Sequence, residues 1–370
     1  MLSRVLTECL ISHPCLVVRY QCQINGSGRV KHLTPFTLVP FCYNVARHQG
    51  TVVLWKGLTS SYVTRGVCFA VETALSDFCN LPRQVTRLSS VKKMSQHMLL
   101  KAIAFAVTTP FMATNFVELV QSAIATDQSS VMDYLRETVF RLSGRGHLAT
   151  SGTRLLPIYV LVLPTVCFHM LHYSISQLAR ATTLSLQRNK YSDLSSMSRS
   201  LQNVDRLSIG GGSVVDQSGY DSDDRNSIAS SEPTSVPFVQ PDPARELRIQ
   251  QQRCLAELLA IFTGNLMADL TLYPAQTILH RLYIQGTRTI VDSTDNGLEV
   301  LAISTRYSGF FDCAHHIYRD EGIGGFFRGF GAVILQYSLQ AVVLRCAAAA
   351  FDYLAPPPRP HNQRRSRRFR

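Results

Sequence analysis

One phrase of sequence occurs near both ends of this 370-residue chain, and this repetition limits the possible folds more than any single motif does. Near the N-terminus HPCLVVRYQCQ is followed by QGTVVLWKG, and near the C-terminus YPAQTILHRLYIQ is followed by EGIGGFFRG. Each copy has a proline in a helix-like stretch and a base five or seven positions later, Arg19 after Pro14 and Arg281 after Pro274. Each then has a glycine, four residues, an aromatic residue, a base and a second glycine. These residues are Gly50, Trp55, Lys56 and Gly57 in the first copy, and Gly322, Phe327, Arg328 and Gly329, preceded by Glu321, in the last.

A third and weaker copy lies between these two. The segment TTPFMATNFVELVQ carries Pro110, and Gln121 follows eleven positions later, just as Gln285 follows Pro274. The three prolines are roughly 100 residues apart once a serine-rich insert at 189–245 is left out. Three repeats with two membrane helices each predict an all-α membrane protein of six transmembrane helices, with a short amphipathic helix between the odd and even helix of each repeat.

The repeats set the expected boundaries along the chain. Transmembrane helices are expected near 3–24, 57–79, 96–122, 154–186, 247–284 and 329–354, with short amphipathic helices near 36–48, 129–142 and 308–319. The predicted organisation is repeat 1 at 1–85, a degenerate repeat 2 at 86–188, a disordered insert at 189–245, repeat 3 at 246–355 and a disordered basic tail at 356–370. Met1 lies only 13 residues before Pro14, so the first helix is expected to be truncated. An even number of spans places both termini and the insert on one side of the membrane.

Composition favours a membrane bundle with basic flanks. Apolar residues make up 46% of the chain and charged residues 17%, whereas about 25% of a typical soluble domain is charged. The apolar windows contain scattered polar residues, as in bundles that surround an internal cavity. The formal charge is +12, and the tail PPPRPHNQRRSRRFR alone holds six arginines. This tail could meet an anionic membrane surface or nucleic acid, or remain a solvated terminus.

The sequence gives little sign of metal, cofactor or enzyme chemistry. The ten cysteines are spread singly with no CxxC pair, so neither a zinc site nor a disulfide framework is indicated. His169 and His172 lie one helical turn apart but lack an acid or cysteine partner at helical spacing. The chain shows no phosphate loop, nucleophile elbow or paired carboxylates. We therefore expect no metal, no cofactor and no enzymatic activity.

These motifs resemble the signature of the mitochondrial carrier family, in which proline is followed by an acid two positions later and by a base five positions later. The resemblance is strongest in the first and last thirds, and HLTPFT and LHRLYIQGTRTIVDSTDNGLEVL resemble a divergent outer-membrane branch of that family. It implies that the acids and bases form an ionic gate between neighbouring odd helices. Here the acid positions are Leu16, Met112 and Gln276, and the base positions are Arg19, Asn115 and Leu279. A gate of three ion pairs cannot form from one arginine.

The resemblance implies an adaptor in the mitochondrial outer membrane, with its termini and insert in the cytosol. It implies roles in mitochondrial fission and fusion, cristae maintenance and lipid supply from the endoplasmic reticulum. The implied partners are membrane lipids, mitofusins, the inner-membrane dynamin-like GTPase, the cristae-organising complex and the endoplasmic reticulum membrane complex, with no nucleic acid. The polar segment 286–306 is the preferred contact surface. The alternative is a transporter of an unknown solute or lipid, for which Arg65 is the candidate cavity contact.

Overall fold

The structure is a computed structural model that describes residues 12–83, 90–122, 131–142, 156–209, 243–287, 289–295 and 297–354. The chain divides into two compact units. The first unit comprises Met1–Ala179 and Phe262–Cys346, and the second comprises Arg180–Ile261 and Ala347–Arg370. All the polar sites described below lie in the first unit.

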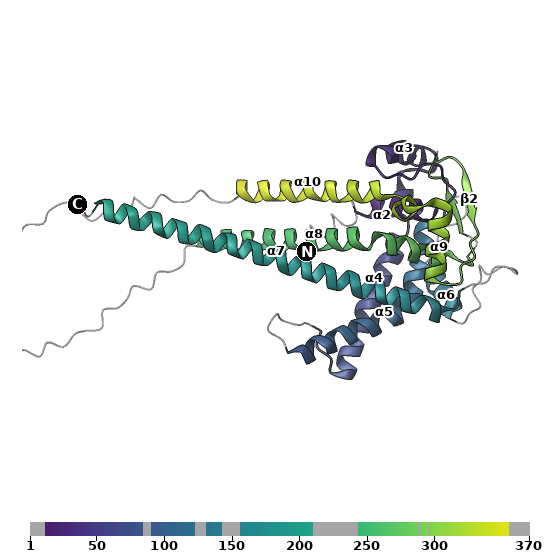
Figure 1. Cartoon of the computed structure of the whole chain (residues 1–370), viewed down its shortest axis with the longest axis horizontal. Coiled ribbons are helices and arrows are strands. Elements are labelled where there is room, and N and C mark those ends of the chain that lie inside the picture. The colour runs from purple at the N-terminus through teal and green to yellow at the C-terminus, as the bar shows by residue number, and fades with distance from the viewer. Residues whose placement is uncertain are drawn as a thin grey trace, which may run out of the picture. The chain divides into compact units, whose positions relative to one another are not determined.

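Three successive helices with a 12-residue helix in the middle occur three times along the chain (Figure 1). The first set is α2 (His13–Ile24), α3 (Leu38–Gln49) and α4 (Leu58–Cys79). The second set is α5 (Val91–Val120), α6 (Val131–Leu142) and α7 (Ile158–Ile209). The third set is α8 (Pro243–Ile284), α9 (Phe310–Glu321) and α10 (Phe330–Leu354). Short 3₁₀ turns, Pro35–Thr37, Thr51–Trp55 and Ile323–Phe327, precede α3, α4 and α10.

Four helical segments are long and apolar enough to cross a membrane by length and composition: Val91–Val120, Ile158–Asn189, Gln250–Ile284 and Ile323–Phe351. α4 has 22 residues and could also span a bilayer by its length. The described part of α2 has 12 residues, and the upstream residues of the expected helix 3–24 lie outside the described part of the chain. The structure is thus a mostly helical membrane fold with four clear candidate spans.

The short helices are amphipathic because their apolar residues recur at helical spacing. In α3 the side chains of Leu38, Phe41 and Val45 are buried, while Val39 and Tyr43 on the other face are exposed. In α9 Cys313 and Ile317, four residues apart, are the buried positions. α3 and α9 therefore pack an apolar face onto the fold, as the sequence pattern predicts, whereas the buried side chains of α6 are Tyr134, Thr138 and Arg141.

Helix extends into both ends of the segment 189–245, which the sequence predicts as an insert. α7 continues as helix to Ile209, and α8 already begins at Pro243. The extension has a physical reason in the sequence, because no glycine or proline occurs between 189 and 209, and Leu194, Met197 and Leu201 recur at helical spacing. Residues 210–242 and the tail at 355–370 lie outside the described residues.

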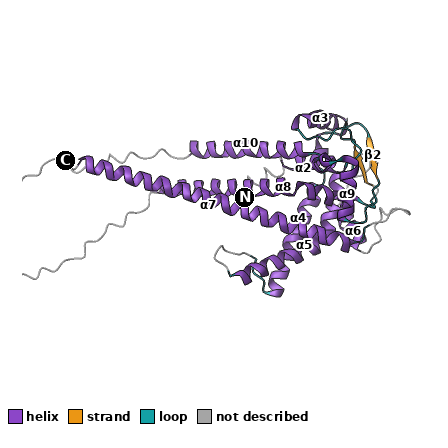
Figure 2. Cartoon of the chain, viewed as in Figure 1, coloured by secondary structure: helices purple, strands orange, loops and turns teal. Residues whose placement is uncertain are grey.

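A small two-stranded sheet, coloured orange in Figure 2, lies between α8 and α9, where the sequence predicted only a polar connection. Strand β1 (Thr289–Asp292) pairs antiparallel with β2 (Val300–Ile303). β1 is largely buried, whereas β2 alternates between exposed and half-buried side chains. The segment 286–306 is expected as an exposed contact surface, but its first half, including β1, is largely buried against the rest of the protein.

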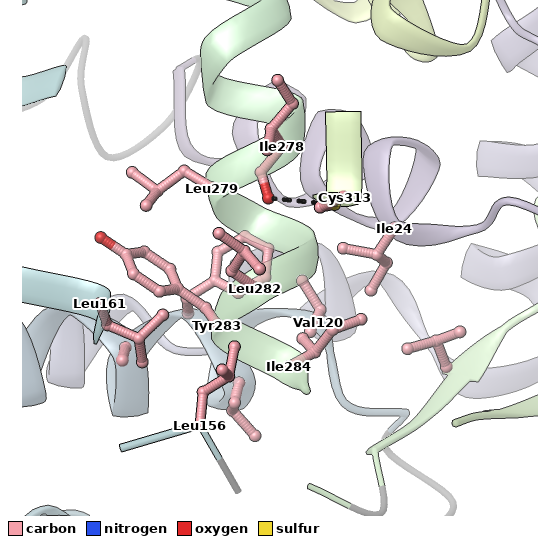
Figure 3. Close-up of a cluster of buried hydrophobic side chains, with 14 of the residues drawn as sticks. Ile24, Val120, Leu156, Leu161, Ile278, Leu279, Leu282, Tyr283, Ile284 and Cys313 are labelled. Atoms are coloured by element: carbon pink, nitrogen blue, oxygen red, sulfur yellow. Dashed lines mark hydrogen bonds between the residues drawn. The ribbon is translucent and has the colours of Figure 1, made fainter. Parts of the chain in front are cut away.

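The main apolar cluster forms around the end of α8 (Figure 3). Leu279, Leu282 and Ile284 of this helix are each 1% exposed. They lie in one cluster with Val120 at the end of α5 and Ile24 at the end of α2. The ends of the three odd helices therefore share one core, and their polar neighbours must be arranged around it.

Candidate functional site

Arg19 is the one basic side chain at the predicted gate positions, and it lies against α8. It is 2% exposed, and its Nη1 donates to Oδ2 of Asp269 at 3.2 Å. Its Nη2 donates to Oε1 of Gln276, the position where the signature places an acid. The guanidinium also lies 4.8 Å above the ring centroid of Tyr273. α2 and α8 are thus joined by one ion pair displaced seven residues along α8, and by a hydrogen bond to a neutral amide at the gate position.

The other gate positions form no charged pair. Asn115 on α5 accepts hydrogen bonds from Ser60 at 2.8 Å and Ser61 at 3.1 Å, both on α4. Leu279 is buried in the apolar cluster of Figure 3, and Met112 is half-buried. Leu16 lines a cavity between the helices. Apolar packing and neutral hydrogen bonds therefore occupy two of the three places where ionic gates would lie.

Asp269 on α8 binds polar side chains from three other helices. Besides Arg19 of α2, it accepts a hydrogen bond from the hydroxyl of Tyr337 on α10 at 2.9 Å. Nε2 of His172 on α7 lies 3.1 Å from its other carboxylate oxygen. A carboxylate with three partners can remain charged in an apolar setting. Sequence reasoning missed this cluster, although Asp269 is the only acid between Glu257 and Asp292 and lies seven residues before Gln276, on the same helical face.

A cavity of about 240 Å³ opens beside this cluster. Arg65 lines it, as do Leu16, His172 and Asp269. The volume is slightly below the range of roughly 300 to 1,000 Å³ that is usual for ligand pockets. The remaining lining residues are mostly polar or aromatic: Ser12, His13, Leu58, Ser61, Tyr62, Asn265, Gln336, Tyr337 and Gln340. The structure therefore offers a small polar space next to Arg65, with the capacity for one small solute.

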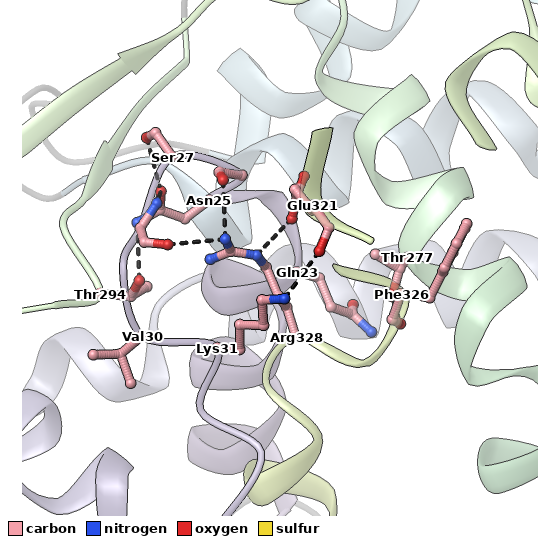
Figure 4. A network of polar contacts seen from close by, with 12 residues as sticks. Gln23, Asn25, Ser27, Val30, Lys31, Thr277, Thr294, Glu321, Phe326 and Arg328 are labelled. Atoms are coloured by element: carbon pink, nitrogen blue, oxygen red, sulfur yellow. Dashed lines mark hydrogen bonds and ion pairs between the residues drawn. The ribbon is translucent and has the colours of Figure 1, made fainter. Parts of the chain in front are cut away.

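A second polar network joins the signature residues of the third repeat (Figure 4). Glu321 accepts both from Arg281, Nη2 to Oε2 at 3.0 Å, and from Nε of Arg328 at 2.6 Å. Nη2 of Arg328 continues to the carbonyl oxygens of Gly26 at 3.0 Å and Gly28 at 2.8 Å. All three charged side chains are less than 10% exposed. The signature acid and bases of this repeat thus form a buried ionic cluster that also holds the loop after α2.

Cations of all three repeats point at the carbonyl end of the next repeat's odd helix. Lys56 Nζ donates to the carbonyl oxygen of Gln121, just after α5. Arg141 on α6 donates to the carbonyl oxygen of Tyr283 near the end of α8 at 3.3 Å, and Arg328 makes the equivalent contact after α2. Carbonyl ends of helices attract positive charge. Burial lowers the pKa of Lys56 to about 8, although Asp292 and Glu118 oppose this shift. The three contacts close a ring around one end of the bundle.

The remaining signature residues have positions that suit helix starts and turns. Gly57 and Gly329 begin α4 and α10 with φ of +65° and +75°, which L-residues rarely adopt. Gly50 and Gly322 also have positive φ, but among the described residues no atom beyond their chain neighbours lies within 4 Å of where a Cβ would be. Phe327 stacks on Tyr273 with ring centroids 6.1 Å apart, and Trp55 ends the 3₁₀ turn before Gly57.

The prolines and the signature glutamines differ in their surroundings. Pro110 and Pro274 lie inside α5 and α8. Pro14 is the second residue of the described α2, where a missing N–H costs little, so the structure does not show it as an interior kink. Gln285 pairs with the backbone of Tyr307 in both directions, at 2.8 and 3.0 Å. Gln121 contributes its backbone carbonyl oxygen to Lys56.

Histidine pairs do not assemble into a metal centre within the described part of the chain, where no group of three or more His, Cys, Asp or Glu side chains could hold an ion. His169 instead stacks on Phe105, with ring centroids 5.1 Å apart. His316 lies between Asp312 and Asp320 on the exposed side of α9, at 3.7 and 3.9 Å.

Comparisons with known proteins agree with this architecture. Residues 250–350 match the family described as mitochondrial carrier protein. The mitochondrial outer membrane protein SLC25A46 of Homo sapiens is 36% identical over 354 residues, which cover 95% of this chain and 73% of the human protein. This chain belongs to the mitochondrial carrier family. The SLC25A46 proteins of Gallus gallus and Danio rerio are 35% and 36% identical over 353 residues, covering 95% of this chain and 75% and 77% of theirs. As a carrier-family protein with these relatives and several candidate spans, it is a multi-pass protein of the mitochondrial outer membrane.

Proposed function

We propose that this chain is an outer-membrane adaptor with a six-span carrier fold that does not work by alternating access. The observation that carries this proposal is the contact between Arg19 and the amide of Gln276, at a position where a gate would have a carboxylate. Alternating access by the carrier mechanism needs ion pairs that break and re-form between odd helices. With Leu16, Met112 and Leu279 at other gate positions, those pairs are missing.

The proposed role is in mitochondrial fission and fusion, cristae maintenance and lipid supply from the endoplasmic reticulum. The partners proposed are those that the family resemblance implies: mitofusins, the inner-membrane dynamin-like GTPase, the cristae-organising complex and the endoplasmic reticulum membrane complex. In this arrangement α2 and α4 are the two further spans, and the termini and insert face the cytosol. The protein acts through these contacts and has no enzymatic step.

A working transporter of a solute or lipid is the second candidate, and the cavity beside Arg65 favours it. Arg65→Gln separates the two functions, because it removes the charge from the cavity wall and leaves the helix ends intact. Arg47→Gln, an exposed arginine in the last turn of α3, is the matched control. Both variants are introduced into cells that lack the endogenous protein.

An adaptor with Arg65→Gln is expected to restore mitochondrial shape as well as the Arg47→Gln control does. In parallel, the purified wild-type protein in liposomes is tested for exchange of radiolabelled metabolites and fluorescent phospholipids. The adaptor proposal predicts no saturable exchange above protein-free liposomes. Saturable exchange that Arg65→Gln abolishes, together with loss of shape rescue, would establish the transporter instead.

A further inference from the structure

The first repeat lacks the acid that organises the third repeat. In the third repeat Glu321 precedes Gly322 and binds Arg281, seven residues after Pro274. The equivalent residues of the first repeat are Gln49, which precedes Gly50, and Gln21, seven residues after Pro14. Both are neutral amides, so the first repeat has donors but no carboxylate of its own at this place.

A carboxylate from another repeat occupies that place. Asp292, the last residue of β1, is 1% exposed. Its Oδ1 accepts from Nε2 of Gln49 at 2.8 Å and from the hydroxyl of Ser122 at 2.7 Å, and its Oδ2 accepts from Nε2 of Gln21 at 3.4 Å. Lys56, the signature base of the first repeat, interacts electrostatically with the carboxylate of Asp292. Asp292 therefore binds Gln21 and lies near Lys56, the equivalents of the two partners of Glu321, and it also binds Gln49 at the position of the missing acid.

The rest of the hairpin is fastened to the first two repeats as well. The amide of Ser122, just after α5, donates to the carbonyl oxygen of Ile290 at 2.7 Å. Nδ2 of Asn25 donates to the hydroxyl of Thr294 at 2.9 Å, and Nε2 of His32 donates to the carbonyl oxygen of Thr294 at 2.8 Å. The hairpin is thus attached to the loop after α2 and to the end of α5 by several independent hydrogen bonds.

The turn of the hairpin adds contacts that fix its register on the first repeat. The backbone amides of Arg29 and Val30 both donate to the carboxylate of Asp295 at 2.9 Å. Gly297 has φ of +68°, and a Cβ there would lie 3.0 Å from a methyl carbon of Val45 on α3 and 3.2 Å from the carbonyl oxygen of Phe41. The turn therefore lies closely against α3, and this contact keeps Asp292 in register with its donors.

We propose that Asp292 replaces the missing signature acid of the first repeat, and that the β1–β2 hairpin acts as a clasp that keeps this end of the bundle closed. The clasp joins α2, α3 and the end of α5, which belong to two repeats that would have to separate if the end opened. A buried carboxylate without partners is costly, so the hairpin and its donors stabilise each other. This proposal rests on the proposed function, because a permanently closed end is incompatible with alternating access.

Hydrogen–deuterium exchange of the full-length protein in lipid nanodiscs tests the clasp. Asp292→Asn should speed amide exchange about tenfold in α3 and at the end of α5, because a buried charged hydrogen-bond acceptor is lost. The matched control is Glu299→Gln, which makes the same chemical change at an exposed position of the same hairpin. Ser122→Ala removes one of the three donors, and gives a milder change in the same segments if Asp292→Asn fails to fold.

Moving the acid back to the first repeat gives a sharper test. Gln49→Glu alone should accelerate exchange in the same segments, because it brings two carboxylates together. Gln49→Glu combined with Asp292→Asn should return the amide exchange rates in these segments to within about twofold of wild type, since one carboxylate is again present among the hydrogen-bond donors. The clasp is overturned if Asp292→Asn and Ser122→Ala match Glu299→Gln, or if the double variant is no better than the two single variants.

The amide hydrogen exchange measurement is independent of solute transport, so the clasp proposal and the adaptor proposal can fail separately. Saturable exchange of a solute by wild-type liposomes would end the adaptor proposal even if Asp292→Asn loosened α3. Unchanged amide exchange in Asp292→Asn, with no solute exchange by the wild type, would end the clasp alone.

Discussion

The charged guanidinium of Arg19 contacts three different groups of α8. The carboxylate of Asp269, the amide oxygen of Gln276 and the ring face of Tyr273 all surround its guanidinium. Only the first of these carries a full negative charge. A buried arginine that loses its counter-ion is strongly destabilising, whereas replacing a whole buried pair by apolar residues often costs little. Asp269 is therefore more important for stability than Gln276.

Asp269→Ala is expected to destabilise the protein by about 3–5 kcal/mol, because it leaves Arg19 buried without a carboxylate. The double variant Arg19→Met with Asp269→Leu should be closer to wild type, since neither charge remains. Thermal unfolding in nanodiscs, followed by tryptophan fluorescence or calorimetry, measures both. Gln276→Leu is the neighbouring control on the same helix. Equal losses in Asp269→Ala and Gln276→Leu would show that the ion pair has no special weight.

At the scale of helices and strands, local signals predicted most of the fold. Expected helices 57–79 and 329–354 match α4 and α10 closely, because Gly57 and Gly329 mark their starts. The β1–β2 hairpin was missed because two short strands are barely stable alone. It is held by contacts from Asn25 and Ser122, far away in sequence, which no local pattern reveals. The extension of α7 was missed for a different reason, because the serine content of 189–209 outweighed its helical spacing.

The turns before α4 and α10 give a testable difference between glycines. A Cβ at Gly329 would lie 2.6 Å from Cβ of Cys22 and 3.1 Å from the carbonyl oxygen of Arg19, and φ is +75°. Gly322 has almost the same φ, +72°, but in the described part of the chain no atom beyond its chain neighbours lies within 4 Å of its Cβ position. Gly329→Ala should therefore destabilise the protein by about 1–3 kcal/mol through overpacking, in addition to the backbone strain, whereas Gly322→Ala should cost backbone strain alone.

The melting temperatures of Gly329→Ala and Gly322→Ala, measured side by side, check this expectation. Gly322→Ala reports backbone strain without overpacking, because its φ of +72° combines with ψ of −170°, a conformation almost restricted to glycine. A melting temperature of Gly329→Ala equal to that of the wild type would mean that α10 can move away from α2 without cost, which contradicts the close contact between Gly329 and Cys22.

For the candidate site, the sequence identified the positions but not all of the partners. Gln276 and Arg19 follow from the repeat, and the structure brings them together. Asp269, His172 and Tyr337 depend on which faces of four helices meet, and a repeat pattern does not specify this. Partners that come from distant parts of the chain, such as these three side chains, are therefore the site residues that the sequence is least able to predict.

At the scale of the whole molecule, topology is the main open prediction of the proposed function. If the termini and the insert face the cytosol, protease added to intact mitochondria should cut within 189–245 and leave both halves in the membrane. An antibody tag at each terminus follows the fragments, and an intermembrane-space protein serves as the protected control. Cleavage that occurs only after the outer membrane is ruptured would contradict this orientation.

The position of Asp292 also has a consequence for how the protein is made. Its donors Gln49 and Gln21 precede it by 243 and 271 residues. During synthesis the first two repeats emerge long before the hairpin, and domains near the N-terminus usually begin to fold first. Gln21 and Gln49 of the first repeat therefore lack their hydrogen-bond acceptor until the last third of the chain has been translated and inserted. During that interval, newly made protein should depend on chaperones and insertion factors.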